Sequence, residues 1–131
     1  MTSSFKNLDY KELHVLQRVF LEAKFNRYAC DEDLQASETV NSLFKEIIDE
    51  LVARSIEQWG PSERERMDNW LRLTEERAEW ATAILRVKSH SRWRVYSTEE
   101  KEAYVRLLLD PFVLCGEGKT LFFELCEHQH R

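Results

Sequence analysis

Glycine and proline, the residues that most often interrupt helices, are scarce in this sequence: it has three glycines and two prolines in 131 residues. This scarcity excludes collagen-like and low-complexity chains, which are rich in both. Apolar residues make up 43% and charged residues 33%, a balance that favours long regular elements around a core. A chain of this length suits one domain. We therefore expect residues 1–131 to form a single all-α domain.

Long apolar runs are also missing. No segment approaches the roughly 20 apolar residues that a membrane span needs, and the first thirty residues lack the apolar stretch of a secretory signal. The sequence therefore predicts a cytoplasmic protein without membrane contact. The cysteines, Cys30, Cys115 and Cys126, are odd in number and form no CxxC pair, so we expect buried free thiols rather than disulfides or a zinc site.

The formal net charge of −5 argues against a protein that coats nucleic acid. The charges are unevenly placed along the chain. Residues 28–53 contain seven acids and one base, whereas Arg86, Lys88, Arg92 and Arg94 follow one another with no acid between them. We expect one acidic and one basic pole.

Capping signals mark the first two helices. Asp9 and Glu12 have the spacing of a capping box, which opens a helix that fades near residues 28–30. Ser37 fits the N-cap of a second helix, which is apolar over about half its circumference. Gly60-Pro61 ends that helix, because glycine can take the left-handed conformation and proline cannot continue a helix.

Ser62 and Glu65 repeat the capping-box spacing, so we expect a third helix over about residues 62–88, antiparallel to the second and paired with it at the centre of the bundle. This segment carries two apolar stripes side by side, more than a helix in a simple bundle needs to bury. The expected core stripe consists of Met67, Trp70, Leu71, Thr74, Ala78, Ala81 and Leu85. The second stripe consists of Leu73, Trp80, Ile84 and Val87, with Arg66 and Arg77 in the same sector.

Residues 89–96 break the helical period and predict a connector. Ser97 and Glu100 form a third capping box, which opens a short helix that stops at Asp110-Pro111. Over residues 111–126, two short helices and a small β-hairpin both fit; we favour helices, because an isolated hairpin is marginally stable. The expected architecture is a compact bundle of four to five helices.

Three local patterns resemble ligand sites but have the wrong spacing or lack partners. Gly118-Lys119-Thr120 lacks the earlier glycine of a phosphate-binding loop, whose place holds Val113, and the acidic run 31–33 lacks the glycine and glutamate of a calcium loop. The terminal segment with Cys126, His128 and His130 lacks matching metal ligands elsewhere. No recognisable motif joins a nucleophile, a base and an orienting group. We therefore predict no enzyme activity, no cofactor and no metal.

Two segments are candidate contact surfaces. The second stripe of the third helix has the composition of an interface hot spot, since Trp and Arg supply contact area and planar hydrogen bonding; the alternative is an internal contact. The connector mixes cations with aromatics, which suits an acidic protein surface or nucleic acid; the alternative is a basic helix end whose aromatics anchor the connector in the core. The candidate partner-binding residues are Arg66, Leu73, Arg77, Trp80, Ile84, Arg92, Trp93, Arg94 and Tyr96.

These patterns predict a small helical macromolecule-binding protein, of the adaptor, inhibitor or immunity type, that docks on a protein partner, with a homodimer left open. One alternative is a nucleic-acid-binding regulatory protein that uses the basic aromatic segment 86–96. A second alternative is a small helical enzyme with an unrecognised pocket. The docking hypothesis requires Leu73 and Trp80 to face solvent.

Overall fold

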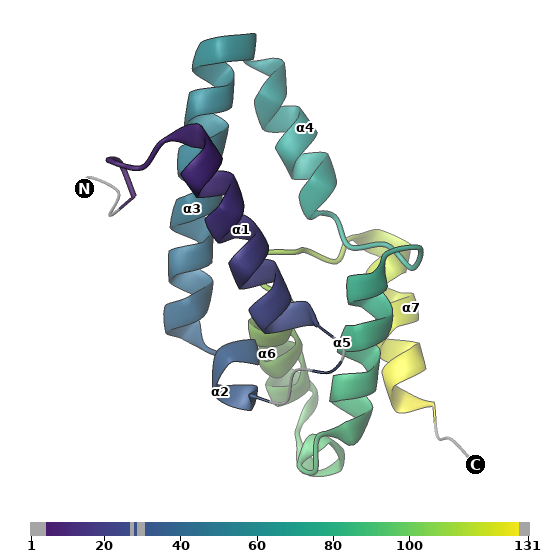
Figure 1. Cartoon of the computed structure of the whole chain (residues 1–131). Coiled ribbons are helices and arrows are strands. Elements are labelled where there is room, and N and C mark those ends of the chain that lie inside the picture. The colour runs from purple at the N-terminus through teal and green to yellow at the C-terminus, as the bar shows by residue number, and fades with distance from the viewer. Residues whose placement is uncertain (1–4, 27, 29–30, 129–131) are drawn as a thin grey trace.

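The computed structural model describes residues 5–26, 28 and 31–128, and within them the chain forms seven α-helices, one 3₁₀ helix and no strand (Figure 1). The elements are α1 (Tyr10–Phe25), α2 (Glu32–Gln35), α3 (Glu38–Trp59), α4 (Ser62–Leu71), α5 (Ala78–Ser89), η1 (Trp93–Val95), α6 (Thr98–Leu109) and α7 (Gly116–Glu127). The predicted all-α class and compact helix packing are confirmed. Of the segment left open, residues 111–126, the part from Gly116 onward belongs to α7, and residues 111–115 are not helical. One helix forms there in place of the two short helices that we favoured, and the hairpin does not form.

The helix starts that rest on local hydrogen bonds form as predicted. At α1, Asp9 Oδ1 accepts from the Glu12 amide at 2.7 Å, and the Asp9 amide donates to Glu12 Oε1 at 2.9 Å. Ser97 and Glu100 make the same reciprocal pair at α6. Each box satisfies two amides that have no partner within the helix.

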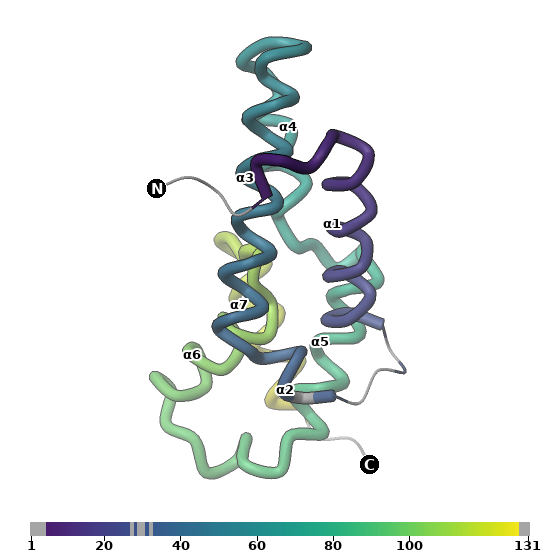
Figure 2. Tube along the Cα trace, turned by 60° about the vertical axis from the view of Figure 1, so that its left-hand side comes forward, coloured from purple at the N-terminus to yellow at the C-terminus, as the bar shows by residue number. Residues whose placement is uncertain are grey.

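α3 and α4 form an antiparallel hairpin whose tip extends beyond the other helices in both views (Figures 1 and 2). Gly60 ends α3 with a φ of +102°, a conformation that favours glycine. The predicted Ser62–Glu65 capping box is wrong: the N-cap of α4 is Pro61, without a side-chain hydrogen bond. The central place predicted for the pair is also wrong for α4, none of whose ten residues is buried.

The prediction of a single third helix over residues 62–88 is wrong, because the chain is not helical between the end of α4 at Leu71 and the start of α5 at Ala78. The Leu73 amide donates to the Val113 carbonyl at 2.9 Å, and the Val113 amide donates to the Leu71 carbonyl at 2.8 Å. The Thr74 side chain hydrogen-bonds Glu76 and lowers the pKa of that carboxyl. These bonds replace helical ones, so the break is set by the distant segment around Val113 and no Gly or Pro marks it. This division and the short α2 raise the helix count above the expected four to five.

The break also changes which face of α5 is buried. Trp80 and Val87, from the predicted second stripe, are 4% and 0% exposed. Ala78, Ala81 and Leu85, from the predicted core stripe, are exposed, Leu85 by 54%. The non-helical residues between the two helices reset the phase, so the helical period of α4 does not predict the buried face of α5.

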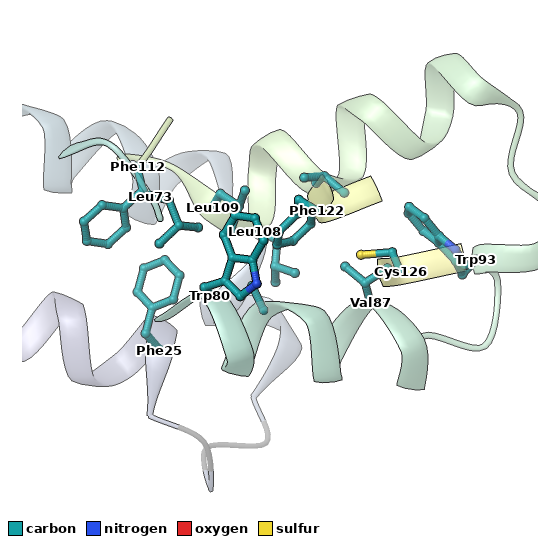
Figure 3. Close-up of a cluster of buried hydrophobic side chains, with 12 residues drawn as sticks. Phe25, Leu73, Trp80, Val87, Trp93, Leu108, Leu109, Phe112, Phe122 and Cys126 are labelled. Atoms are coloured by element: carbon teal, nitrogen blue, oxygen red, sulfur yellow. The ribbon is translucent and has the colours of Figure 1, made fainter. Parts of the chain in front are cut away.

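Most of the core lies where α5, α6 and α7 meet the end of α1. Trp80 packs edge-on against Phe122 with ring centroids 5.1 Å apart, and Phe25 meets Phe112 at 5.3 Å (Figure 3). Smaller clusters join α1 to α3 and α3 to α4. α4 packs mainly on α3, and its last two residues, Trp70 and Leu71, also pack against the main core. None of the helices in the described residues is long and apolar enough to cross a membrane.

Candidate functional site

The docking face predicted around Leu73 and Trp80 is not formed, because these side chains are 3% and 4% exposed and belong to the main core cluster. Ile84 is partly buried and packs against the same cluster. The condition that the docking hypothesis placed on Leu73 and Trp80 is therefore not met, and any contact surface must lie elsewhere.

Arg77 makes an internal contact, so of its two predicted roles the internal one is correct. Its guanidinium donates to the Trp70 carbonyl, pairs with Glu79 at 3.1 Å, and lies 4.5 Å from the Phe112 ring centroid and 5.1 Å from that of Trp70. Its carboxylate partner comes from the start of its own helix rather than from a neighbour. Arg77 thus ties the end of α4 to the start of α5.

The connector after α5 exposes its cations and buries its large aromatic ring. Trp93 is 4% exposed, and Tyr96 is half-buried with its hydroxyl 3.0 Å from His90 Nε2, whereas Arg92 and Arg94 are exposed. The aromatic rings therefore anchor the connector in the core. They form no open platform on which unpaired bases could stack.

Arg86, the first residue of the predicted basic segment, connects two helices. Its guanidinium donates to the carbonyls of Lys24 and Asn26, at the end of α1. Cationic side chains stabilise a helix C-terminus by meeting its unpaired carbonyls. Arg86 therefore has a structural role at the junction of α1 and α5.

A groove of about 370 Å³ lies between α1, α3 and α4, and it is the candidate functional site. It arises because α3 packs against both other helices while α4 diverges from α1 (Figures 1 and 2). Its surface combines aliphatic, aromatic and cationic side chains. The lining residues are Tyr10, His14, Gln17, Arg18, Leu21, Val52, Ser55, Glu63, Arg66, Met67 and Trp70.

The apolar part of the groove is only partly covered by the chain itself. Leu21, Met67 and Trp70 are half-buried and pack against a small cluster that contains the buried Val52. Tyr10, the first residue of α1, is fixed at the border of the groove by its hydroxyl, which lies 3.2 Å from Ser55 Oγ. The groove thus presents apolar surface on a preformed frame of three helices.

The charges of the groove are mainly positive, although the chain as a whole carries −5. Arg18 on α1 and Arg66 on α4 are exposed, the Arg66 side chain by 80%. The acid of the lining, Glu63, is 15% exposed and forms an ion pair with Arg66 at 3.5 Å, so the lining keeps an excess of one positive charge. Two guanidinium groups therefore flank the apolar part from opposite helices.

A larger groove, about 640 Å³, lies beside α6 and the start of α7, but its charges are largely matched. Lys45 pairs with Asp110 at 3.2 Å, and Lys119 lies 4.0 Å from Glu102. Its lining has three basic and three acidic residues. Without an excess of either sign it selects no class of partner, so we prefer the groove between α1, α3 and α4.

Lys24 is a buried cation that the sequence patterns did not single out. It is 0% exposed, and its ammonium donates to Asn41 Oδ1 and to the carbonyls of Leu107, at 3.2 Å, and Asp110. Burial lowers the pKa of Lys24 to about 7, while the Asp110 carboxylate opposes the shift. The sequence did contain a sign of its burial: Lys24 follows Phe20 by four residues, and residues four apart lie on the same face of a helix, here the inward face of α1. Lys24 joins α1, α3 and the end of α6, and therefore acts in the fold.

The thiols differ from the prediction that all are buried. Cys126 is buried, and burial raises the pKa of its thiol to about 12, so it stays protonated at neutral pH. Cys115 is exposed. Cys30 and His130 lie outside the described residues. Within those residues no group of three His, Cys, Asp or Glu side chains is arranged to hold a metal ion.

Comparisons with protein-family models, with curated proteins and with solved structures find no match.

Proposed function

We propose that this chain is a small helical protein-binding module that receives an amphipathic helix, flanked by acidic residues, from a partner protein in the groove between α1, α3 and α4. One observation carries the proposal: α4 has no buried residue, yet it contributes Met67 and Trp70 to a partly open apolar groove. A helix in a folded domain normally buries one face. A helix from a partner would complete the burial of this one.

The shape of the groove favours a helix as its occupant. The groove is bordered by three helices, α1, α3 and α4, and packing a fourth helix against three is a common solution for such faces. Amphipathic helices bind grooves of this kind through apolar side chains spaced by three or four residues. Leu21, Met67 and Trp70 supply the apolar surface that such side chains would contact.

The charges favour an acidic partner. Arg18 and Arg66 lie on opposite helices, so acidic residues on both edges of an incoming apolar stripe would meet a guanidinium group. Charges at the rim of an interface mainly set association rate, salt dependence and partner choice, and each contributes modestly to affinity. The apolar surface would provide most of the binding free energy.

This proposal keeps the protein-binding function and the cytoplasmic location expected from the sequence, and it moves the contact surface. Of the candidate residues, Arg66 stays in the proposed surface. Nucleic acid is a weaker alternative, because Trp93 is buried and Arg86 is bound to backbone carbonyls. A second copy of the chain is the occupant that the experiment below must exclude.

Fluorescence anisotropy with two labelled peptides tests the proposal. One peptide is an amphipathic helix with leucines at helical spacing and glutamates beside them, and the other has lysines in place of the glutamates. The acidic peptide should bind the chain, and the lysine peptide should bind at least tenfold more weakly. Arg18→Glu and Arg66→Glu should each weaken binding of the acidic peptide by about fivefold at low salt.

Arg92→Glu is the matched control, because Arg92 is an exposed arginine outside the groove and its reversal changes the net charge equally. It should leave binding within twofold. Equal binding of the two peptides, or an equal effect of all three variants, would contradict the proposal. Sedimentation that shows a dimer dissociated by Arg18→Glu or Arg66→Glu would identify a second copy as the occupant and overturn the proposed partner.

A further inference from the structure

A second pocket, about 540 Å³ in volume, lies where the C-terminal ends of α5 and α7 meet the connector. It is separate from the groove between α1, α3 and α4 and shares no lining residue with it. Its volume is in the range of small-molecule sites. The lining residues are Lys88, Ser89, His90, Ser91, Trp93, Arg94, Cys126, Glu127 and His128.

The charged groups of this pocket favour an anion. Glu127, the acid of its lining, is paired with Lys101 at 2.6 Å. The ends of α5 and α7 contribute partial negative charge, which Lys88 in the last turn of α5 offsets. Arg94 and the imidazoles of His90 and His128 add hydrogen-bond donors around the same volume.

Part of the lining is held in place before any ligand binds. The His90 ring stacks on Tyr104 with centroids 4.3 Å apart and planes 10° apart, and its Nε2 lies 3.0 Å from the Tyr96 hydroxyl. Both contacts come from elements outside α5, so the ring is fixed from two sides. A ligand that uses His90 would lose little side-chain entropy in ordering it.

Trp93 has a buried hydrogen-bond donor without an acceptor. Its indole Nε1 is the buried side-chain nitrogen or oxygen that lacks a partner among the described residues. Figure 3 shows Trp93 at one end of the main apolar cluster, beyond Val87 and Cys126. Leaving such a donor unpaired destabilises a fold, so native structures usually supply an acceptor. A ligand oxygen beside Trp93 would be such an acceptor.

We propose that this pocket binds the phosphate group of a small molecule. A guanidinium, an ammonium, two imidazoles and the Ser91 hydroxyl border one volume, and such a set of donors matches a tetrahedral group with several acceptor oxygens. The volume exceeds that of a phosphate ion, which leaves space for an organic remainder. An oxygen of a phosphate group bound beside Arg94 and Trp93 would accept a hydrogen bond from the indole donor.

The indole N–H signals in a ¹H–¹⁵N correlation spectrum test this proposal. The chain has four tryptophans, and the signal that is missing from the Trp93→Phe variant belongs to Trp93. The probes are inorganic phosphate and phenyl phosphate, each compared with chloride at equal ionic strength. The Trp93 indole signal should move downfield and saturate with one or both phosphates and not with chloride. Tighter binding of phenyl phosphate would indicate an organic phosphate, and tighter binding of inorganic phosphate a free ion.

Two neighbouring arginines provide the variants. Arg94 lines the pocket and Arg92 does not, although both are exposed residues of the same connector. Arg94→Glu should weaken binding by at least about tenfold, because it replaces a charge-assisted donor with a repelling carboxylate. Arg92→Glu should change it by less than threefold. No saturable movement with either phosphate, or equal losses in the two variants, would overturn the proposal without affecting the helix-binding groove.

Discussion

Replacing Lys24 with methionine tests the physical account of the fold, because the two side chains have similar length and only lysine titrates. Lys24 lies among the Asn41 side chain and the carbonyls at the end of α6, and the charged groups that act on it are Asp110, Arg86 and Lys45. Burial disfavours its charged form more than Asp110 favours it, so the pKa falls from 10.5 to about 7.

The shift has a defined consequence for stability. Between pH 7 and pH 10.5 the unfolded chain binds a proton at Lys24 that the folded chain does not, so the free energy of unfolding rises with pH across this window. Each pH unit corresponds to about 1.4 kcal/mol, which gives about 5 kcal/mol over the whole window. Below pH 7 both states bind the proton, and above pH 10.5 neither does, so the contribution is constant outside it.

Urea denaturation followed by circular dichroism, at several pH values from 6 to 9.5, measures this effect for the parent chain and for Lys24→Met. Other titrating groups cancel in the difference between the two. That difference should rise, in favour of the parent chain, by about 3 kcal/mol between pH 7.5 and pH 9.5. Lys11→Met, at an exposed position of the same helix, separates the effect of burial from that of one lost positive charge. A difference that stays constant, or falls, would show that the surrounding oxygens keep the ammonium charged and that burial does not lower the pKa of Lys24.

Three further stability predictions follow from the packing, each measurable by thermal or urea denaturation at neutral pH. Trp80→Ala should destabilise the chain by about 3–5 kcal/mol, whereas Leu85→Ala should cost less than about 1 kcal/mol. Comparable losses would mean that α5 buries Leu85 as deeply as Trp80 and would contradict the observed packing. Arg77→Ala should cost about 2 kcal/mol of stability, and Arg77→Lys should recover less than half of it, because an ammonium cannot stack on the Trp70 and Phe112 rings as a planar guanidinium does. Full recovery by lysine would show that this stacking does not contribute to stability. Ser97→Ala should cost about 1 kcal/mol, and a neutral result would remove the capping box as a determinant of α6.

The elements that could be predicted from the sequence are those fixed by nearby residues. The starts of α1 and α6 depend on a cap and an acid three residues apart, and the end of α3 depends on a glycine followed by proline. These interactions need no other part of the chain, so the local pattern contains them.

The break between α4 and α5 could not be predicted in this way, because its hydrogen bonds come from Val113. The helical period continues through residues 72–77 without a glycine or proline, and every face assigned beyond the break was therefore shifted. The error moved Leu73 and Trp80 from the core to a supposed surface. Of the proposed groove, Arg66 was predicted as a contact residue, but the divergence of α4 from α1 is a tertiary feature that no spacing records.

If the groove between α1, α3 and α4 receives an acidic amphipathic helix, the backbone amide shifts of the ¹⁵N-labelled chain, mapped on saturation with the acidic peptide, will locate that helix in the groove. We expect the largest shifts at groove residues such as Gln17, Val52 and Met67. Shifts should be small at Val15 and Val19, which are 52% and 54% exposed on the same α1 but do not line the groove. Shifts centred on Val15 and Val19 or on the connector, or no saturable shifts in the groove, would contradict this expectation.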